Sequence, residues 1–130
     1  MRARGPYKVN VLAEAAAVAA LSEGPDGIGW VVEHAALAVA HRDRFLVRLR
    51  ALGLSPAPAA GNFVFVPVAH AQAIANGMSR RGVLVRVLCD LPRDIPELAA
   101  AGGSALRIGV GPWTAMERVL DALEETLACA

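Results

Sequence analysis

Three short apolar runs dominate the second half of this 130-residue chain and decide which folds are open to it. They cover residues 62–68, 83–88 and 105–110, are rich in Val, Leu, Ile and Phe, and lack the three- and four-residue spacing of an amphipathic helix. Residues 70–81 predict a helix between the first two runs, which ends at Gly82. We therefore expect a small open sheet of about three strands.

The last segment of the chain, at about residues 112–128, predicts a helix that packs on this sheet. Pro112 suits the first helical turn, and Thr114 and Glu117 have the spacing of a capping box. The connection between the second and third predicted strands is expected to be a loop with one helical turn at residues 95–101.

The first half of the chain predicts helices only. Residues 1–22 are expected to form an extended arm and a short linker helix with Asn10 as its N-cap. Residues 26–52 predict a long helix, for which Asp26 is the candidate cap. Its apolar positions predict one buried stripe, which consists of Ile28, Val32, Ala35, Val39, Leu46 and Leu49.

These elements together predict an α/β fold, a two-layer sandwich in which helices pack on one face of the small sheet and a long helix precedes it. We expect residues 1–130 to form a single domain, with residues 62–130 as the α/β core. A composition of 55% hydrophobic and 19% charged residues supports a folded chain with a buried core.

The charge balance and the hydropathy pattern exclude several classes of partner. Thirteen Lys and Arg residues against twelve Asp and Glu residues give a net charge of +1, too balanced for a protein that neutralises a phosphate backbone. The chain has no run of 18 apolar residues and no signal-peptide pattern. We expect a cytoplasmic protein that binds neither nucleic acid nor a membrane.

Arg86 and Arg107 interrupt the second and third predicted strands at positions where Val or Ile would be expected. Guanidinium groups on adjacent strands can clamp a carboxylate or phosphate, because their donors form a planar fork. The alternative is structural: either arginine faces solvent on the open side of the sheet or forms a salt bridge with a helix. These two are the candidate binding residues, and no catalytic or metal-binding residue is predicted.

The turn at residues 109–113, between the third strand and the last helix, is a second candidate for anion binding. Free backbone N–H groups and the helix dipole favour anions at such a place. The turn lacks the glycine patterns of nucleotide-binding loops. Gly111 is equally well explained as the residue that precedes the helix.

Metal binding and disulfide formation are not indicated. His34 and His41 lie two turns apart on the long predicted helix, and His70 is isolated, so we expect structural roles for all three. Cys89 and Cys129 belong to no CxxC or Cys/His cluster, which predicts free thiols in a reducing compartment.

Five segments with distinctive sequences follow one another along the chain. They are residues 4–10 (Arg-Gly-Pro-Tyr-Lys-Val-Asn), 52–54 (Leu-Gly-Leu), 62–66 (Asn-Phe-Val-Phe-Val), 81–86 (Arg-Gly-Val-Leu-Val-Arg) and 105–111 (Ala-Leu-Arg-Ile-Gly-Val-Gly). In order and at nearly the same spacing, they resemble motifs of the histidinol-phosphate aminotransferases, beginning with that family's R-x-P-Y-x-V-N segment. The resemblance covers essentially the whole chain.

The resemblance implies the C-terminal third of a fold type I, pyridoxal-phosphate-dependent aminotransferase of amino-acid biosynthesis, comprising part of the interdomain helix region and the small domain. In the family, the arginines of the G-V-x-V-R and L-R-I-x-V-G motifs bind the distal anion of the substrate. Arg86 and Arg107 match these two positions. The implied substrate of the intact enzyme is an anionic small molecule, an amino acid or a phosphorylated amino alcohol.

The sequence does not contain the family's motifs for binding the cofactor. The Schiff-base lysine and the groups that hold the cofactor precede the five matching segments in the family, and Lys8 matches a variable position. The resemblance therefore implies that this chain binds no pyridoxal phosphate alone, is inactive alone, and associates with itself or with a missing large domain. The longer loop at residues 89–104 and the Gly-Pro-Trp at 111–113 leave the substrate open. The alternative is a free-standing small-molecule-binding or dimerisation module derived from that domain.

Overall fold

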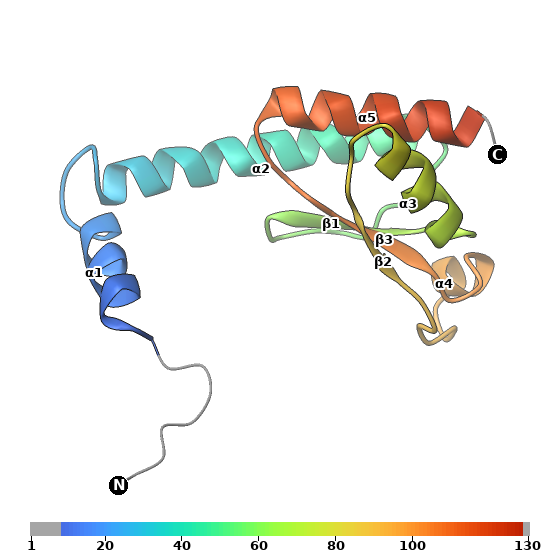
Figure 1. Ribbon diagram of the computed structural model, residues 1–130, viewed down its shortest axis with the longest axis horizontal. Helices are drawn as coiled ribbons and strands as arrows, with labels where there is room; N and C mark the ends of the chain where they lie inside the picture. The colour runs from blue at the N-terminus through green and yellow to red at the C-terminus, as the bar shows by residue number, and fades with distance from the viewer. Residues whose placement is uncertain (1–8, 129–130) are drawn as a thin grey trace, which may run out of the picture. The chain divides into compact units, whose positions relative to one another are not determined.

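The structure is a computed structural model that describes residues 9–128 (Figure 1). Its elements, in order, are α1 (Val11–Ala20), α2 (Ile28–Ala51), β1 (Phe63–Pro67), α3 (Ala71–Arg80), β2 (Arg86–Leu88), α4 (Pro96–Ala100), β3 (Ala105–Gly109) and α5 (Trp113–Ala128). The described residues fall into two compact units, which divide between Leu37 and Ala38. That residues 1–130 form one domain stays a prediction.

The sheet of the second unit has three strands in the order β1-β3-β2, and both pairings are antiparallel. β3 is therefore the central strand, although it is the last to occur in the sequence. The register pairs Val64 with Ile108 and Val66 with Leu106. Because side chains alternate across a strand, these four residues point to the same face of the sheet.

Helices cover that face and form the core with it. Val64, Val66, Leu106 and Ile108 are at most 2% exposed. They join one cluster of buried side chains with the end of α2, with α3 and with α5, whose members include Phe45, Leu49, Ile74, Met78, Met116, Leu120 and Leu123. The fold class expected from the sequence, a two-layer α/β sandwich with helices on one face of a small open sheet, is confirmed (Figure 1).

Two side chains of α2, both in the second unit, contact the start of α5 and the turn before it. The Arg44 Cζ atom lies 3.6 Å from the centroid of the Trp113 ring, within the range of a cation–π contact. His41 Nδ1 is hydrogen-bonded to the carbonyl oxygen of Gly111 at 3.1 Å. These contacts hold the turn between β3 and α5 against the helical layer.

The helix starts differ from the sequence expectations in two places. α2 begins at Ile28, and Gly27, not Asp26, supplies the carbonyl that accepts the first helical hydrogen bond, from Val31. A side chain at Gly27 would collide with the Ser22 carbonyl, so only glycine fits there.

The capping box expected at Thr114 and Glu117 is wrong, because α5 already includes Trp113 as its first residue. The Glu117 carboxylate accepts a hydrogen bond from the Trp113 indole N–H at 2.6 Å. The expected second strand is also shorter than its apolar run, since only residues 86–88 pair with β3.

The buried stripe expected along α2 is confirmed only near its end, at Leu46 and Leu49, whereas Ile28, Val32 and Val39 are exposed.

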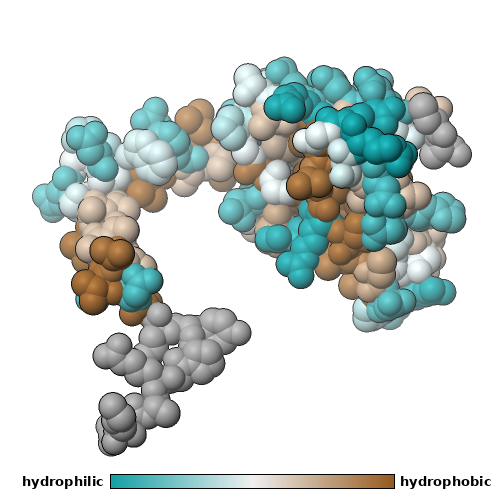
Figure 2. Space-filling view, viewed as in Figure 1, coloured by the Kyte–Doolittle hydropathy of each residue, from teal (hydrophilic) through white to brown (hydrophobic). Residues whose placement is uncertain are grey.

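The first unit contains α1 and the beginning of α2. Asn10 caps α1 as expected, accepting a hydrogen bond from the Ala13 N–H at 2.8 Å. α1 buries none of its ten residues, although Glu14 is its only charged residue. Figure 2 shows the hydrophobic surface that this leaves on the helix.

Candidate anion-binding site

The register of the sheet brings the two candidate arginines together. Arg86 of β2 is the direct partner of Arg107 on the central strand. Directly opposed residues of an antiparallel pair have their side chains on the same face, with Cβ atoms about 4.5–5.5 Å apart. Both arginines therefore belong to the face opposite the helical layer, which we call the open face. Arg86 is exposed and Arg107 is half-buried.

Two aromatic residues of β1 share the open face. Phe65 is the direct partner of Arg107, and Phe63 is the partner of Gly109. The Arg107 Cζ atom lies 4.1 Å from the centroid of the Phe63 ring. The Arg107 guanidinium thus stacks on an aromatic ring on the β1 side of the central strand, whereas Arg86 lies on the β2 side.

Within residues 9–128, neither arginine forms a salt bridge. The two ion pairs of that part of the chain join Arg42 to Asp43 and Arg81 to Glu125. Glu117, an acid near β3 in the sequence, is hydrogen-bonded to Trp113. The structural alternative of a salt bridge to a helix therefore has no support among the described residues, whereas the solvent-facing alternative fits the exposure of Arg86.

The turn at residues 109–113 has less to offer an anion than its sequence suggested. The Val110 N–H donates to the Asn62 carbonyl at 2.8 Å, and the Gly111 N–H donates to the Met116 sulfur at 3.2 Å. Two of the backbone donors expected to be free are thus used within the protein. The feature of the turn that still favours an anion is the helix dipole at the N-terminus of α5.

Two of the three histidines use Nδ1 in a hydrogen bond to a backbone carbonyl. His34 Nδ1 is hydrogen-bonded to the Trp30 carbonyl at 2.8 Å, and the two rings stack with centroids 3.7 Å apart. His41 binds the Gly111 carbonyl, and His70 precedes α3 in a left-handed conformation. No group of three metal-ligating side chains occurs among residues 9–128. Cys89 is free and exposed, while Cys129 lies outside the described residues.

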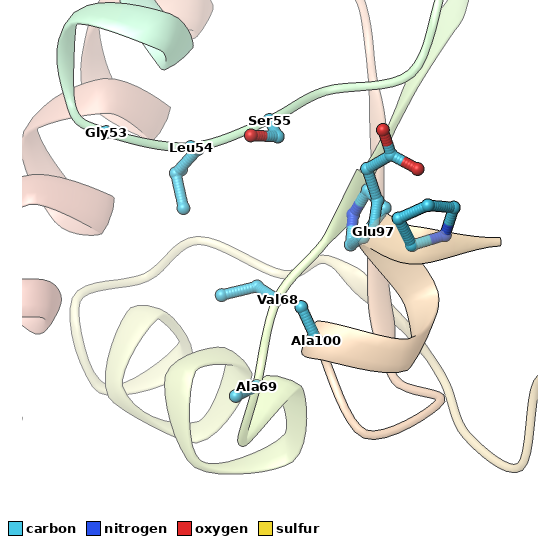
Figure 3. A pocket seen from close by; sticks show the side chains of 9 residues that line it. Gly53, Leu54, Ser55, Val68, Ala69, Glu97 and Ala100 are labelled. Atoms are coloured by element: carbon cyan, nitrogen blue, oxygen red, sulfur yellow. The ribbon is translucent and has the colours of Figure 1, made fainter. Parts of the chain in front are cut away.

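Two surface cavities of the second unit lie away from the arginines. One, of about 420 Å³, is bounded by the chain after α2, the end of β1 and α4, and Figure 3 shows Leu54 and Val68 on its walls. The other, of about 480 Å³, lies between α3 and the end of α5. Neither of these two cavities is lined by Arg86 or Arg107.

Sequence reasoning singled out both arginines but did not name Phe63 as a candidate binding residue. The signal was present in the alternation of the first strand. Val64 and Val66 are the buried positions, and Phe63 and Phe65 fall on the other face, where Phe63 is 36% exposed. Two aromatic residues on the open face next to an arginine indicate a contact surface.

None of the helices that the structure describes is both long enough and apolar enough to cross a membrane. No protein-family model matches the chain.

Curated relatives agree with the motifs. The chain is 36% identical over 126 residues to a histidinol-phosphate aminotransferase of Methylobacillus flagellatus, a match that covers 97% of this chain and 31% of the relative. It is 37% identical over 129 residues to histidinol-phosphate aminotransferase 1 of Thiobacillus denitrificans, covering 99% of this chain and 30% of the relative. The chain thus spans about a third of the length of these relatives.

The fold agrees with the same family. A crystal structure from Burkholderia pseudomallei, assigned as an aminotransferase, superimposes with a TM-score of 0.53 and 28% sequence identity over 68% of this chain and 24% of that chain. The motifs, the α/β fold and these matches lead to one conclusion: the chain is a relative of the histidinol-phosphate aminotransferases and corresponds to their C-terminal third.

Proposed function

We propose that this chain supplies the substrate-anion site of an aminotransferase of the histidinol-phosphate type, with Arg107 and Arg86 as the binding residues. The observation that carries the proposal is their direct pairing across β2 and β3 on the open face. Like charges that face each other across two strands are destabilising, and a bound anion removes that repulsion. A phosphate or carboxylate accepts two parallel N–H bonds from a guanidinium, which a lysine could not offer.

The choice of anion follows from the charge of the pair. Two guanidinium groups on adjacent strands balance a phosphate, which carries up to two negative charges, better than a carboxylate, which carries one. The names of the curated relatives agree, because histidinol phosphate contains such a group. We therefore propose a phosphorylated amino alcohol as the substrate class of the intact enzyme.

The described residues do not fit pyridoxal phosphate. Residues 9–128 contain no lysine, and Lys8, the single lysine of the sequence, lies outside the described residues. A Schiff-base lysine must be desolvated or flanked by charge so that its pKa is lowered. We propose that this chain is not catalytic alone and that the cofactor belongs to another part of the enzyme. A borohydride-reducible, stoichiometric absorbance band that Lys8→Ala abolishes would overturn this statement.

The partner that this function needs is the part of the enzyme that corresponds to the other two thirds of the relatives. The first unit supports such a partner, because Leu12 and Val18 of α1 are 82% and 67% exposed. A helix that is apolar on all sides is normally buried. The same exposed surface also favours the second candidate function, a self-associating module derived from this domain, acting in the cytoplasm. Co-purification of a lysine-bearing large domain from the native host distinguishes the two.

The anion site is tested directly by titrating the isotope-labelled full chain with inorganic phosphate and following the backbone amide resonances of β2 and β3. We expect an affinity in the millimolar range, because water and salt screen an open site. Arg107→Ala should weaken binding about three- to tenfold, and Arg86→Ala should weaken it as well.

The matched control is Arg118→Ala, which removes an exposed arginine from α5 in the helical layer and should leave the phosphate affinity unchanged. Equal affinities of the Arg107→Ala and Arg118→Ala variants would contradict the proposed site.

A further inference from the structure

We infer that Phe63 is a positioning residue for Arg107: its ring holds the guanidinium in a fixed place on the open face, ready to meet an anion. The inference rests on the proposed anion site and adds a residue to it. Its basis is the stacking contact, in which the Arg107 Cζ atom lies 4.1 Å from the Phe63 ring centroid.

The register explains why this ring is available. Phe63 is paired with Gly109, so no side chain lies directly across from it on the central strand. A Cβ added at Gly109 would meet no atom within 4 Å, which means that the space above this glycine is empty. Arg107 is two residues from Gly109 and therefore the diagonal neighbour of Phe63, a separation that a long side chain can bridge.

Among the ring contacts, ion pairs and side-chain hydrogen bonds of the described residues, the Phe63 ring is the partner of this guanidinium. Within residues 9–128, Arg107 has no salt bridge and no side-chain hydrogen bond. An arginine side chain with its many rotamers would otherwise have to be ordered when the anion binds. A guanidinium that lies over a ring can keep the N–H groups at its edge available to oxygen atoms.

Phe65 offers a matched control within the same strand. It is an aromatic residue on the same face and the direct partner of Arg107, yet the guanidinium lies over the ring of Phe63. Phe63→Leu and Phe65→Leu each remove one ring from the open face, so the two variants differ in which ring is lost. Phe63→Tyr keeps a ring at the stacking position and serves as the conservative rescue.

The experiment measures the order of the Arg107 side chain from ¹⁵N relaxation of its Nε–H group, in the full chain and without phosphate. We expect an ordered Nε–H group in the wild type, in Phe63→Tyr and in Phe65→Leu, and a mobile one in Phe63→Leu. Thermal unfolding of the four proteins shows whether each variant is folded. An Nε–H group that stays ordered in Phe63→Leu, or becomes equally mobile in Phe65→Leu, would overturn the inference.

Phosphate titration of the same proteins separates this inference from the proposed function. We expect Phe63→Leu to weaken phosphate binding about two- to fivefold, the range of an exposed cation–π contact, and Phe63→Tyr to restore it. If Arg107→Ala weakens binding but Phe63→Leu does not, the positioning role fails and the anion site stands. If Arg107→Ala has no effect, the anion site itself fails, whatever the order of the side chain.

Discussion

Gly77 allows α3 and α5 to approach more closely than any other residue at that position would. A Cβ at Gly77 would collide with Cγ2 of Thr126 and lie 3.0 Å from its Oγ1. Both residues are buried, and the Thr126 hydroxyl already donates to the Ala122 carbonyl at 2.6 Å. The close packing of α3 against α5 therefore depends on the absence of a side chain at Gly77.

We predict that Gly77→Ala lowers the free energy of unfolding by about 1–2 kcal/mol. Overpacking of a tight contact costs about 1–3 kcal/mol, from which the better helix propensity of Ala recovers up to about 1 kcal/mol. Urea unfolding followed by circular dichroism measures the change.

The second variant that tests this contact is Gly77→Ala combined with Thr126→Ser, which removes the colliding methyl group and keeps the hydroxyl. It should be more stable than Gly77→Ala alone. If Gly77→Ala alone raised the free energy of unfolding, the prediction would be contradicted, because α3 and α5 could then accommodate the added methyl group without a loss of stability.

The arginines of the open face show how much of the candidate site the residue types alone can predict. Arg86 and Arg107 stand out because a charged residue interrupts an apolar run, and this signal needs no structure. Their shared face could not be predicted, because it depends on the register of β2 against β3, and a slip of one residue moves a side chain to the other face. The contact of Phe63 with Arg107 depends on the register of β1 as well.

Among the elements, the existence of each helix and strand followed from the sequence, while some starts did not. The apolar runs, Asn10 and Gly82 mark elements through short-range chemistry. The start of α2 at Ile28, directly after Gly27, depends instead on the approach of Ser22 to Gly27. The start of α5 depends on the indole of Trp113, which takes the Glu117 carboxylate that a capping box would need.

We predict that Arg44→Met weakens the attachment of α2 to α5. The substitution keeps the length and apolar character of the side chain but removes the charge that lies 3.6 Å from the Trp113 ring centroid. The expected loss is about 0.5–1 kcal/mol of unfolding free energy, because the contact is exposed to water. Urea unfolding, with the fluorescence of Trp113 observed in a Trp30→Phe background, measures it.

Arg48→Met is the control for this prediction, since Arg48 is an exposed arginine one turn further along α2. It should change the unfolding midpoint by less than Arg44→Met does. Equal effects of both substitutions would assign the change to the helix charge rather than to the indole.

For the whole molecule, the main question is what covers α1. The helix exposes Val11, Leu12 and Val18, each by at least two thirds of its surface, and buries nothing. Soluble monomers rarely expose contiguous apolar patches larger than a few hundred Å². The chain spans about a third of the length of the relatives that it matches.

We predict that the isolated chain self-associates at tens of micromolar and that Leu12→Glu with Val18→Glu reduces the association. The two carboxylates would place charge on the apolar surface of α1, and burying a charge without a partner is unfavourable. Sedimentation velocity measures the distribution of species. A wild-type chain that sediments as a monomer and binds no dye specific for apolar surface would contradict the prediction.

The strand order of the sheet has a consequence for how the molecule is made. β1 and β2 do not pair with each other. Each pairs with β3, which begins at Ala105 and follows both in the sequence. On the ribosome, neither β1 nor β2 can form its pairing in this sheet until β3 has been synthesised, and the apolar residues of both strands stay exposed until then. The arginine pair arises in the same event, because Arg107 arrives on the strand that closes the sheet.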